Sequence, residues 1–419
     1  MSKKKEFFFG LVTIAIMILT VEVALRILGI AVPEVEIFAD SDSIPIAIPD
    51  LRLGIRPNPE FPGHDANGFR NECVPEQADI IAMGDSQTYG MGVRTNQAWP
   101  HQLSRITGKQ VYSMAFGSYG PLHCQELLPK ALSLNPKLII LAFYSGNDLY
   151  DAFQLVYGER ADPHWTIMKN KEQSVLDEIH RAEAKETLIS EAFRLTARVL
   201  GKPVGDVGKI DSVHNSSFLS RHFRIVRLVE MLIQKLSKKF APHRDLERKS
   251  PDQAETTAKL FWTFDNGELR TVFNPTYRQF ALDRSDPRIE EGFRLCLEGM
   301  RLMAQTARRN SVPFAVLLIP TKELVFKNAV GEALGDNSDE RYRRLVTTEE
   351  HVLEDVRDYL EDHEIPVIDC RDALRRSLQS GPLPYRTTND GHPAPAGYRA
   401  IAGEVALEID RLGLGGGNG

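Results

Sequence analysis

The chain has 419 residues, which is enough for one large domain with insertions or for two domains. Hydrophobic residues make up 42% of the chain, which excludes wholesale disorder, and the net charge of -6, with both signs interspersed, gives no argument for binding nucleic acid. The four cysteines form no CxxC pair and no zinc-like spacing with histidine, so we expect no metal or organic cofactor. We expect the cysteines to be small core residues, with disulfide pairing left open.

The N-terminus carries a long apolar segment preceded by three lysines. Glu22 and Arg26 interrupt this segment, but their i,i+4 spacing allows them to pair on one face of a helix or to reach the headgroups. Residues 1–32 are therefore predicted to be a single-pass anchor in the inner membrane, with the remaining chain on the extracytoplasmic side. A cleaved signal peptide that ends near residues 29–31 is the alternative.

A Pro-rich stretch, residues 33–63, is predicted to be a linker, and a βα rhythm begins after it. Short apolar runs predict buried parallel strands over residues 78–83, 111–115, 138–144, 313–319 and 366–369. Helical patterns cover residues 99–106, 288–309, 349–361 and 396–412. This alternation predicts an α/β three-layer sandwich with a five-stranded parallel sheet over residues 64–151 and 286–412, and residues 413–419 form a Gly-rich tail that we expect to be disordered.

The βα rhythm stops over residues 152–285, which are predicted to be a mainly helical insertion. Helix patterns cover residues 173–200 and 220–240, and a short stretch at 261–273 has β character. The helix at 220–240 carries basic residues beside an apolar stripe, so it either packs on its own domain or lies on an anionic membrane. Because the insertion closely follows Asn147, it is a candidate lid or substrate wall.

Polar residues with catalytic potential follow the predicted strands. Ser86 follows the first strand and is either a helix cap or an exposed nucleophile. Asn147 follows the third strand, and Asp390 and His392 precede the last helix. Taken singly, Ser86 is typical of a helix cap, Asn147 of a turn, and Asp390 and His392 of a loop. Because function in parallel α/β folds lies at the carboxyl ends of the strands, we expect them to lie close together.

Together these segments resemble the SGNH, or GDSL, hydrolase superfamily. The matching residues are Gly84, Asp85, Ser86 and Gly90 of the first block, Gly117 of the second, Asn147 of the third, and Asp390 and His392 of the last. Gly120 and Gln125 are similar to a pattern of membrane-anchored members. Residues 67–70 and 319–323 resemble segments of anchored members that are associated with surface polysaccharides. The resemblance covers residues 66–151 and 288–412 and implies a flavodoxin-like sheet.

The resemblance also implies the role of each catalytic residue. Ser86 is the nucleophile, His392 the base and Asp390 the acid that orients the imidazole. The oxyanion hole is formed by the backbone N–H groups of Ser86 and Gly117 and the side-chain amide of Asn147.

The chain departs from the family pattern at three places. The acid of the family usually stands three residues before the base, where this chain has Asn389, whereas Asp390 stands two before it. The shorter spacing resembles that of some polysaccharide O-acetyltransferases. Ala115 and Ser145 replace an asparagine and a glycine of the pattern, and neither position is expected to carry catalysis.

The sequence therefore predicts a serine-dependent ester hydrolase that acts on acylated carbohydrate or a related ester in the cell envelope, through an acyl-Ser86 intermediate. An O-acyltransferase that modifies a surface polysaccharide with the same triad is the first alternative. A catalytically silent binding protein with the same fold is the second. The expected partners are the ester substrate and, through the N-terminal helix, the membrane.

Overall fold

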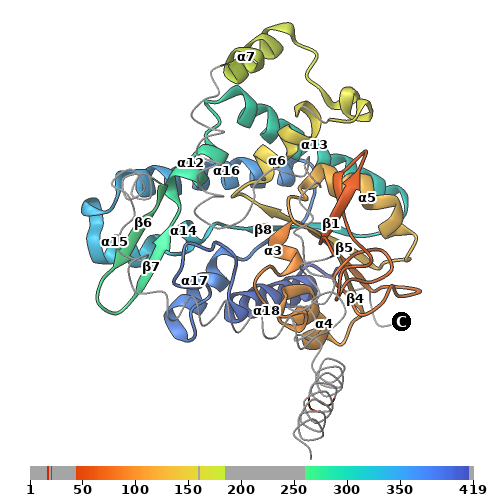
Figure 1. The fold of residues 1–419 in the computed structure, drawn as a ribbon, viewed down its shortest axis with the longest axis horizontal. Coiled ribbons are helices and arrows are strands. Elements are labelled where there is room, and N and C mark those ends of the chain that lie inside the picture. Colours follow the sequence, from red (N-terminus) through yellow and green to blue (C-terminus); the bar gives the residue numbers. More distant parts are fainter. Residues whose placement is uncertain (1–16, 18–19, 21–43, 159–160, 185–259, 415–419) are drawn as a thin grey trace, which may run out of the picture.

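The computed structural model describes residues 17, 20, 44–158, 161–184 and 260–414 (Figure 1). Apart from residues 17 and 20, the predicted anchor over residues 1–32 lies outside these described residues, as do the predicted basic helix over 220–240 and most of the predicted tail over 413–419. Within the described ranges, no helix combines the length and the apolar character needed to cross a membrane.

The centre of the fold is a parallel sheet of five strands. These are β3 (Ile80–Gly84), β4 (Val111–Ala115), β5 (Leu138–Tyr144), β8 (Phe314–Ile319) and β9 (Val367–Asp369). They lie in the order β4-β3-β5-β8-β9, and each neighbouring pair is parallel. All residues of β3, β4, β5 and β8 are buried, which explains why these strands read as uninterrupted apolar runs. The predicted five-stranded parallel sheet is confirmed.

Two layers of helices enclose the sheet (Figure 1). One layer contains α5 (Pro121–Leu132), α6 (Asp148–Tyr157), α13 (Pro287–Arg309) and α16 (Glu340–Asp362), and α13 contacts each of the other three. The other layer contains α4 (Trp99–Thr107), α17 (Arg371–Ser380) and α18 (Pro395–Arg411), and α18 contacts the other two. The short helices α3 (Ser86–Tyr89) and α14 (Lys322–Val325) directly follow β3 and β8, and α15 (Lys327–Leu334) follows α14.

Two helices of the first layer differ from the sequence prediction. α16 begins at Glu340 instead of residue 349, because the Asp339 side chain caps its first turn by accepting hydrogen bonds from two backbone N–H groups. α5 is absent from the prediction. It starts at Pro121 and contains Pro129 in its interior, a residue that is atypical of a helix interior.

The region predicted to be a linker contains a β-hairpin where the structure describes it. β1 (Ala47–Asp50) pairs antiparallel with β2 (Gly54–Pro57). The Tyr119 hydroxyl donates to the carbonyl of Ile55 at 2.9 Å, and the Trp165 indole N–H donates to the carbonyl of Arg52 at 2.7 Å. These bonds hold the hairpin on the domain. The linker prediction missed it because the two strands are short and rich in turn residues.

The described parts of the insertion are α7 (Gln173–Ala184), the antiparallel pair β6 (Trp262–Asp265) and β7 (Arg270–Phe273), and α12 (Pro275–Leu282). The β character predicted for residues 261–273 is thus present as a hairpin. Phe264 and Phe273 are fully buried in the main hydrophobic core, and α12 packs on α16 and α6. Residues 260–285 therefore share the core of the sheet domain, although the predicted boundary places them in the insertion.

All four cysteines are free thiols in the structure. Cys124, Cys296 and Cys370 are buried, as expected for small core residues, whereas Cys73 is exposed.

Candidate active site

Ser86 lies in a tight turn between β3 and α3. Asp85 caps the helix by accepting a hydrogen bond from the Gln87 backbone N–H at 2.8 Å. Gly84 has a φ of +150°, and a Cβ at this position would lie 2.7 Å from Thr88 Oγ1. A glycine is therefore required here, and the turn presents Ser86 beyond the end of the strand.

His392 and Asp390 come from the loop before α18 and reach the same point. His392 Nε2 lies 2.9 Å from Ser86 Oγ, and His392 Nδ1 lies 2.7 Å from Asp390 Oδ1. Asp390 Oδ1 also accepts the His392 backbone N–H at 3.0 Å, so the two-residue spacing closes a small ring. Asn389 makes no hydrogen bond to the imidazole. The structure thus brings together the three residues predicted from the sequence, and it does so with the short spacing.

The charge of Asp390 sets the tautomer of His392. Burial raises the pKa of Asp390, but the hydrogen bonds and charge of His392 and the charge of Arg386 outweigh it and hold this pKa below its ordinary value. An ionised carboxylate only accepts, so Nδ1 carries the proton and Nε2 keeps its lone pair for the Ser86 hydroxyl. The other acceptor of that hydroxyl, Asp85 Oδ2, lies 3.5 Å away and is too distant to compete well.

The three predicted oxyanion-hole groups follow β3, β4 and β5, which are neighbours in the sheet. Within the described part of the chain, the backbone N–H groups of Ser86 and Gly117 have no hydrogen-bond acceptor. The amide of Asn147 already donates to Asp151 Oδ2 at 2.5 Å. An amide nitrogen has two N–H groups, so one donor of Asn147 remains after this bond. The bond fixes the orientation of the amide.

Three carboxyl groups near the nucleophile, of which Asp85 and Asp148 are buried and Asp151 is partly buried, are a feature that the sequence analysis missed. Burial raises the pKa of Asp85 to about 6, although the Gln87 hydrogen bond and the charges of His392 and Arg278 lower it. Burial also raises the pKa of Asp151 to about 7. For Asp148, burial and the charge of Asp85 raise the pKa well above its ordinary range. The cluster therefore carries less than its full negative charge near neutral pH.

The loop that carries the acid and the base, residues 386–392, is called the catalytic loop below. Lys322, from α14, donates through Nζ to the backbone carbonyls of Arg386 at 2.8 Å and Thr388 at 2.6 Å. It also donates to the carbonyl of Val272 in β7, at 3.2 Å. Burial lowers the pKa of Lys322 to about 8. Lys322 thus ties the catalytic loop to β7 and is a positioning residue within the segment 319–323.

A second buried polar group orders the ends of β5 and β8. Glu349 accepts hydrogen bonds from the Ser145 hydroxyl at 2.7 Å and from the backbone N–H of Thr321 at 2.7 Å. It also accepts from the Thr321 hydroxyl. These contacts give Ser145 a structural role. Ala115 ends β4 and is fully buried.

The other segments singled out by the resemblance lie around the site. Arg70, in the segment 67–70, donates to the carbonyls of Gly90 and Val93, both at 2.7 Å, and so fixes the chain that follows α3. Gly120 is the N-cap of α5, and Gln125 lies within that helix. No hydrogen bond joins Gln125 to the triad in the described part of the chain.

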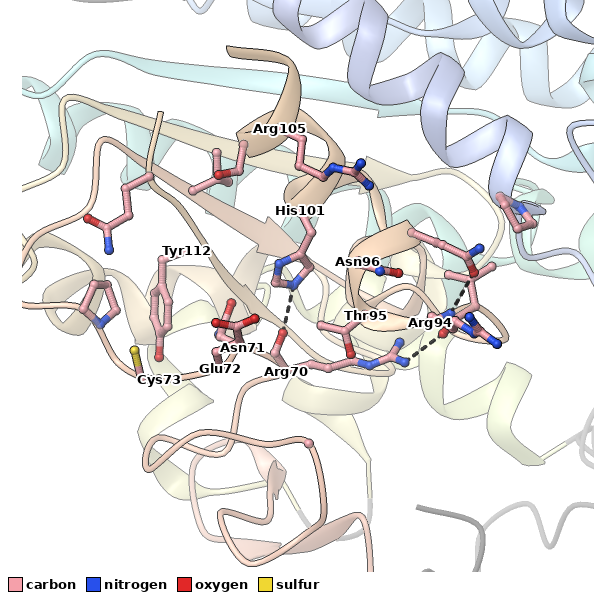
Figure 2. A pocket seen from close by; sticks show the side chains of 18 of the residues that line it. Arg70, Asn71, Glu72, Cys73, Arg94, Thr95, Asn96, His101, Arg105 and Tyr112 are labelled. Atoms are coloured by element: carbon pink, nitrogen blue, oxygen red, sulfur yellow. Dashed lines mark hydrogen bonds between the residues drawn. The ribbon is translucent and has the colours of Figure 1, made fainter. Parts of the chain in front are cut away.

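Figure 2 shows a cavity of about 1140 Å³ whose lining includes Arg70, His101 and Tyr112. Arg386 lines it and donates to Asp390 Oδ2 at 3.1 Å and to the carbonyl of Gly92. Figure 2 shows His101 in this cavity, with its ring nitrogen 3.0 Å from the Arg70 carbonyl. None of the three triad residues lines the cavity.

Arg278, in α12, is a site residue that the sequence analysis missed. Its Nη1 donates to the carbonyl of Gly146 at 2.8 Å, and its guanidinium lies 5.1 Å from the centre of the Tyr144 ring. A Cβ on Gly391 would lie 2.8 Å from Arg278 Nη2, so the guanidinium borders the catalytic loop directly. In the sequence, Arg278 lies just after the stretch with β character, in the region predicted to be the insertion. Nothing in this region indicates that Arg278 lies close to Ser86.

Comparisons with known proteins return solved structures of ester-acting enzymes. One match is a member of the lipolytic protein G-D-S-L family from Veillonella parvula DSM 2008 (12% identity, 79% of this chain and 96% of the other, TM-score 0.31). A GDSL-like lipase from Bacteroides thetaiotaomicron matches at 9% identity over 80% of this chain and 88% of the other, with a TM-score of 0.31. An acetyl xylan esterase matches at 10% identity over 79% of this chain and 98% of the other, with a TM-score of 0.33.

At such TM-scores and identities, these matches assign neither a residue role nor a substrate to this chain. No family model and no curated protein matches the chain.

Proposed function

We propose that this chain is an SGNH-type serine enzyme that acts on esters through an acyl-Ser86 intermediate. The observation that carries the proposal is the unbroken hydrogen-bonded series from Ser86 Oγ through His392 to Asp390. A serine, an imidazole with a free Nε2 and an ionised carboxylate are the parts that nucleophilic acyl transfer requires.

In the first half of the reaction, Ser86 Oγ forms a bond to the ester carbonyl carbon while its proton moves to His392 Nε2. Asp390 stabilises the resulting imidazolium through Nδ1–H. The negative charge on the carbonyl oxygen faces the N–H groups of Ser86, Gly117 and Asn147, each of which is typically worth about 3 kcal/mol in the transition state. The intermediate then collapses, and His392 returns the proton to the departing alcohol.

In the second half, water attacks the acyl-Ser86 carbonyl and gives a proton to His392. The second collapse breaks the bond to Oγ, releases the carboxylic acid and returns the proton to Ser86. Each group ends as it began, so one ester and one water give one acid and one alcohol.

We propose acylated carbohydrate, or a related ester of the cell envelope, as the substrate, with the protein held in the inner membrane by its N-terminal segment. The support is the polysaccharide-associated resemblance of residues 67–70 and 319–323. Both segments contribute to site architecture here, since Arg70 holds the chain after α3 and Lys322 holds the catalytic loop. An O-acyltransferase would use the same acyl-Ser86 and deliver it to a sugar hydroxyl instead of water.

The proposal is tested by covalent labelling with a fluorophosphonate, which traps an activated serine by losing fluoride. We expect one adduct, mapped by peptide mass to the peptide that contains Ser86, and none in Ser86→Ala or in heat-unfolded protein. An adduct on another residue, or no adduct on the folded enzyme, overturns the assignment. Supplying an acetyl ester with and without acetylatable oligosaccharides then separates the reactions, because a transferase forms acetylated sugar faster than free acetate.

A further inference from the structure

Arg278 is a cation without an ionic partner at the edge of the candidate active site. No carboxylate of the described residues lies within ion-pairing distance of it, and its one hydrogen bond goes to the carbonyl of Gly146. The guanidinium lies 5.1 Å from the centre of the Tyr144 ring and 5.0 Å from the centre of the Tyr277 ring. A buried charge is normally paired, so a partly buried arginine with unused N–H groups indicates a missing anion.

The Tyr144 hydroxyl is the second unused group at the same place. Tyr144 is 2% exposed, and its Oη is buried without a hydrogen-bond partner among the described residues. A Cβ on Gly391 would lie 2.8 Å from Arg278 Nη2 and 3.6 Å from Tyr144 Oη. Two donors therefore converge beside the backbone of Gly391, which stands between the acid and the base of the triad.

The glycines of this region leave room for the guanidinium. A Cβ on Gly146 would lie 2.6 Å from the Tyr144 ring and 2.7 Å from Arg278 Nη1, and a Cβ on Gly391 would meet Nη2. Any larger residue at either position would displace Arg278. Gly146 and Gly391 flank Asn147 and His392 in the sequence, so the two donors reach the edge of the reacting centre.

From this geometry we infer that Arg278 and Tyr144 form an anion subsite that selects esters whose alcohol carries a negatively charged oxygen group close to the ester. This inference rests on the proposed function and specifies its substrate class, an acylated acidic sugar in which the anion is a carboxylate or a phosphate. Arg278 supplies a planar N–H donor with a fixed charge, and Tyr144 supplies a neutral O–H donor.

The neighbouring acids do not neutralise this subsite. Glu323 and Glu349 act on Arg278 only at a distance: burial lowers the pKa of Arg278, while Tyr144, Tyr277 and these two acids raise it, with a net increase. Its charge therefore persists at every working pH. Asp151, whose pKa burial raises to about 7, is partly protonated at neutral pH and repels an anionic ligand only weakly.

The test compares substrates that differ only in the group at C6, which is charged in two of them and neutral in the third. Acetate release is measured with methyl glucuronoside, methyl glucoside and methyl glucoside 6-phosphate, each acetylated at its ring hydroxyls. We expect kcat/KM of the wild type to be about 10- to 100-fold higher for an anionic sugar than for the neutral glucoside, as for hydrogen bonds to charged groups. The uronate and phosphate arms identify which anion is preferred.

Three variants locate the source of the preference. Arg278→Gln should bring the ratio of anionic to neutral kcat/KM close to 1, and Arg278→Lys should retain part of it. Tyr144→Phe should lower the ratio about 3- to 10-fold without loss of stability, because its hydroxyl has no partner to lose. The matched control is Arg270→Gln, which removes the same charge from a side chain that is 73% exposed and should leave the ratio at the wild-type value.

Equal kcat/KM for charged and neutral sugars in the wild type overturns the inference while leaving the proposed function intact, provided that turnover requires Ser86. An equal loss of kcat for all three substrates in Arg278→Gln, with an unchanged ratio, also overturns it, because Arg278 would then act on the reaction and not on substrate charge. Turnover that survives Ser86→Ala instead refutes the proposed function itself.

Discussion

The two sides of the catalytic loop differ in how their polar groups are satisfied. On the acid side, Asp390 accepts from both the side chain and the backbone of His392 and from Arg386. On the opposite side, Arg278 Nη2 and the Tyr144 hydroxyl border Gly391 without an acceptor in the described part of the chain. Groups that must keep one arrangement during the reaction are bonded within the protein, whereas groups left unbonded are available to a ligand.

The largest loss of activity should follow from removing the acceptor on the acid side, Asp390. Asp390→Asn removes the negative charge that accepts Nδ1–H of His392, so the imidazole loses both its tautomer and its stabilisation as a cation. We expect kcat to fall by about 10⁴-fold, measured as acetate release under saturating substrate. The neighbouring Asn389→Ala is the matched control and should retain kcat within about threefold. The reverse ranking would assign the acid to the position that the family usually uses.

The next largest effect should come from the oxyanion donors. Asn147→Ala removes an amide that is oriented by Asp151, and we expect kcat to fall by about 10²- to 10³-fold with little change in KM. The reason is that this donor acts on the charge that develops in the transition state. A rise in KM at constant kcat would instead make Asn147 a substrate-binding residue.

The pH dependence of stability tests the protonation state of Glu349, which accepts hydrogen bonds from Ser145 and Thr321. Burial raises the pKa of Glu349 from 4.5 to about 7 in the folded protein, so the folded state holds its proton over a range where the unfolded state has lost it. The contribution of Glu349 to stability is therefore fully present below pH 4.5 and is lost as the pH rises toward 7. At 1.36 kcal/mol per pKa unit, this change amounts to about 3 kcal/mol.

The measurement is the free energy of unfolding by urea at pH 4.5 and pH 7.5 for the wild type and Glu349→Gln. The difference between the two proteins should shrink by about 3 kcal/mol across this range. Glu350→Gln, which removes a partly exposed carboxylate bonded to Lys327, is the matched control and should show no such pH dependence. A difference that stays constant for Glu349→Gln would contradict a protonated Glu349 in the folded state.

The smallest effects sharpen the comparison at two adjacent hydroxyls. Ser145→Ala removes a hydroxyl that donates to buried Glu349 at 2.7 Å and should cost about 1 to 3 kcal/mol of unfolding free energy. Tyr144→Phe removes a buried hydroxyl without a partner and should change this free energy by less than about 0.5 kcal/mol or increase it. A large destabilisation by Tyr144→Phe would show that its hydroxyl is bonded in solution and is not reserved for a ligand.

Much of the sheet could be predicted from sequence because its strands are buried on both faces. The uninterrupted runs that end at Ala115, Tyr144 and Ile319 are visible without any alignment. The hydrogen-bonded arrangement of Ser86, His392 and Asp390 could be predicted because Ser86 and His392 belong to short motifs that fall after a strand or before a helix. The hairpin β1–β2 and the proline-containing helix α5 were missed, because their local sequences favour turns.

The groups around the triad were missed for a different reason. Lys322, Glu349 and Arg278 come from separate elements, and only the folded chain brings them to the strand ends. Local sequence patterns give neither the distance between elements nor the burial of a side chain. These two quantities decide whether a charged side chain is a surface group or part of a site.

Acetate release by Ser86→Ala tests the central claim most directly. The account predicts that kcat falls to the background of the uncatalysed reaction, while the urea unfolding midpoint stays at its wild-type value, because Ser86 is a small, partly exposed residue in a capped turn. Ser285→Ala, which changes an exposed serine outside the site, should keep wild-type kcat. Wild-type turnover by Ser86→Ala would contradict the account, because no step of the proposed reaction can proceed without the Ser86 hydroxyl.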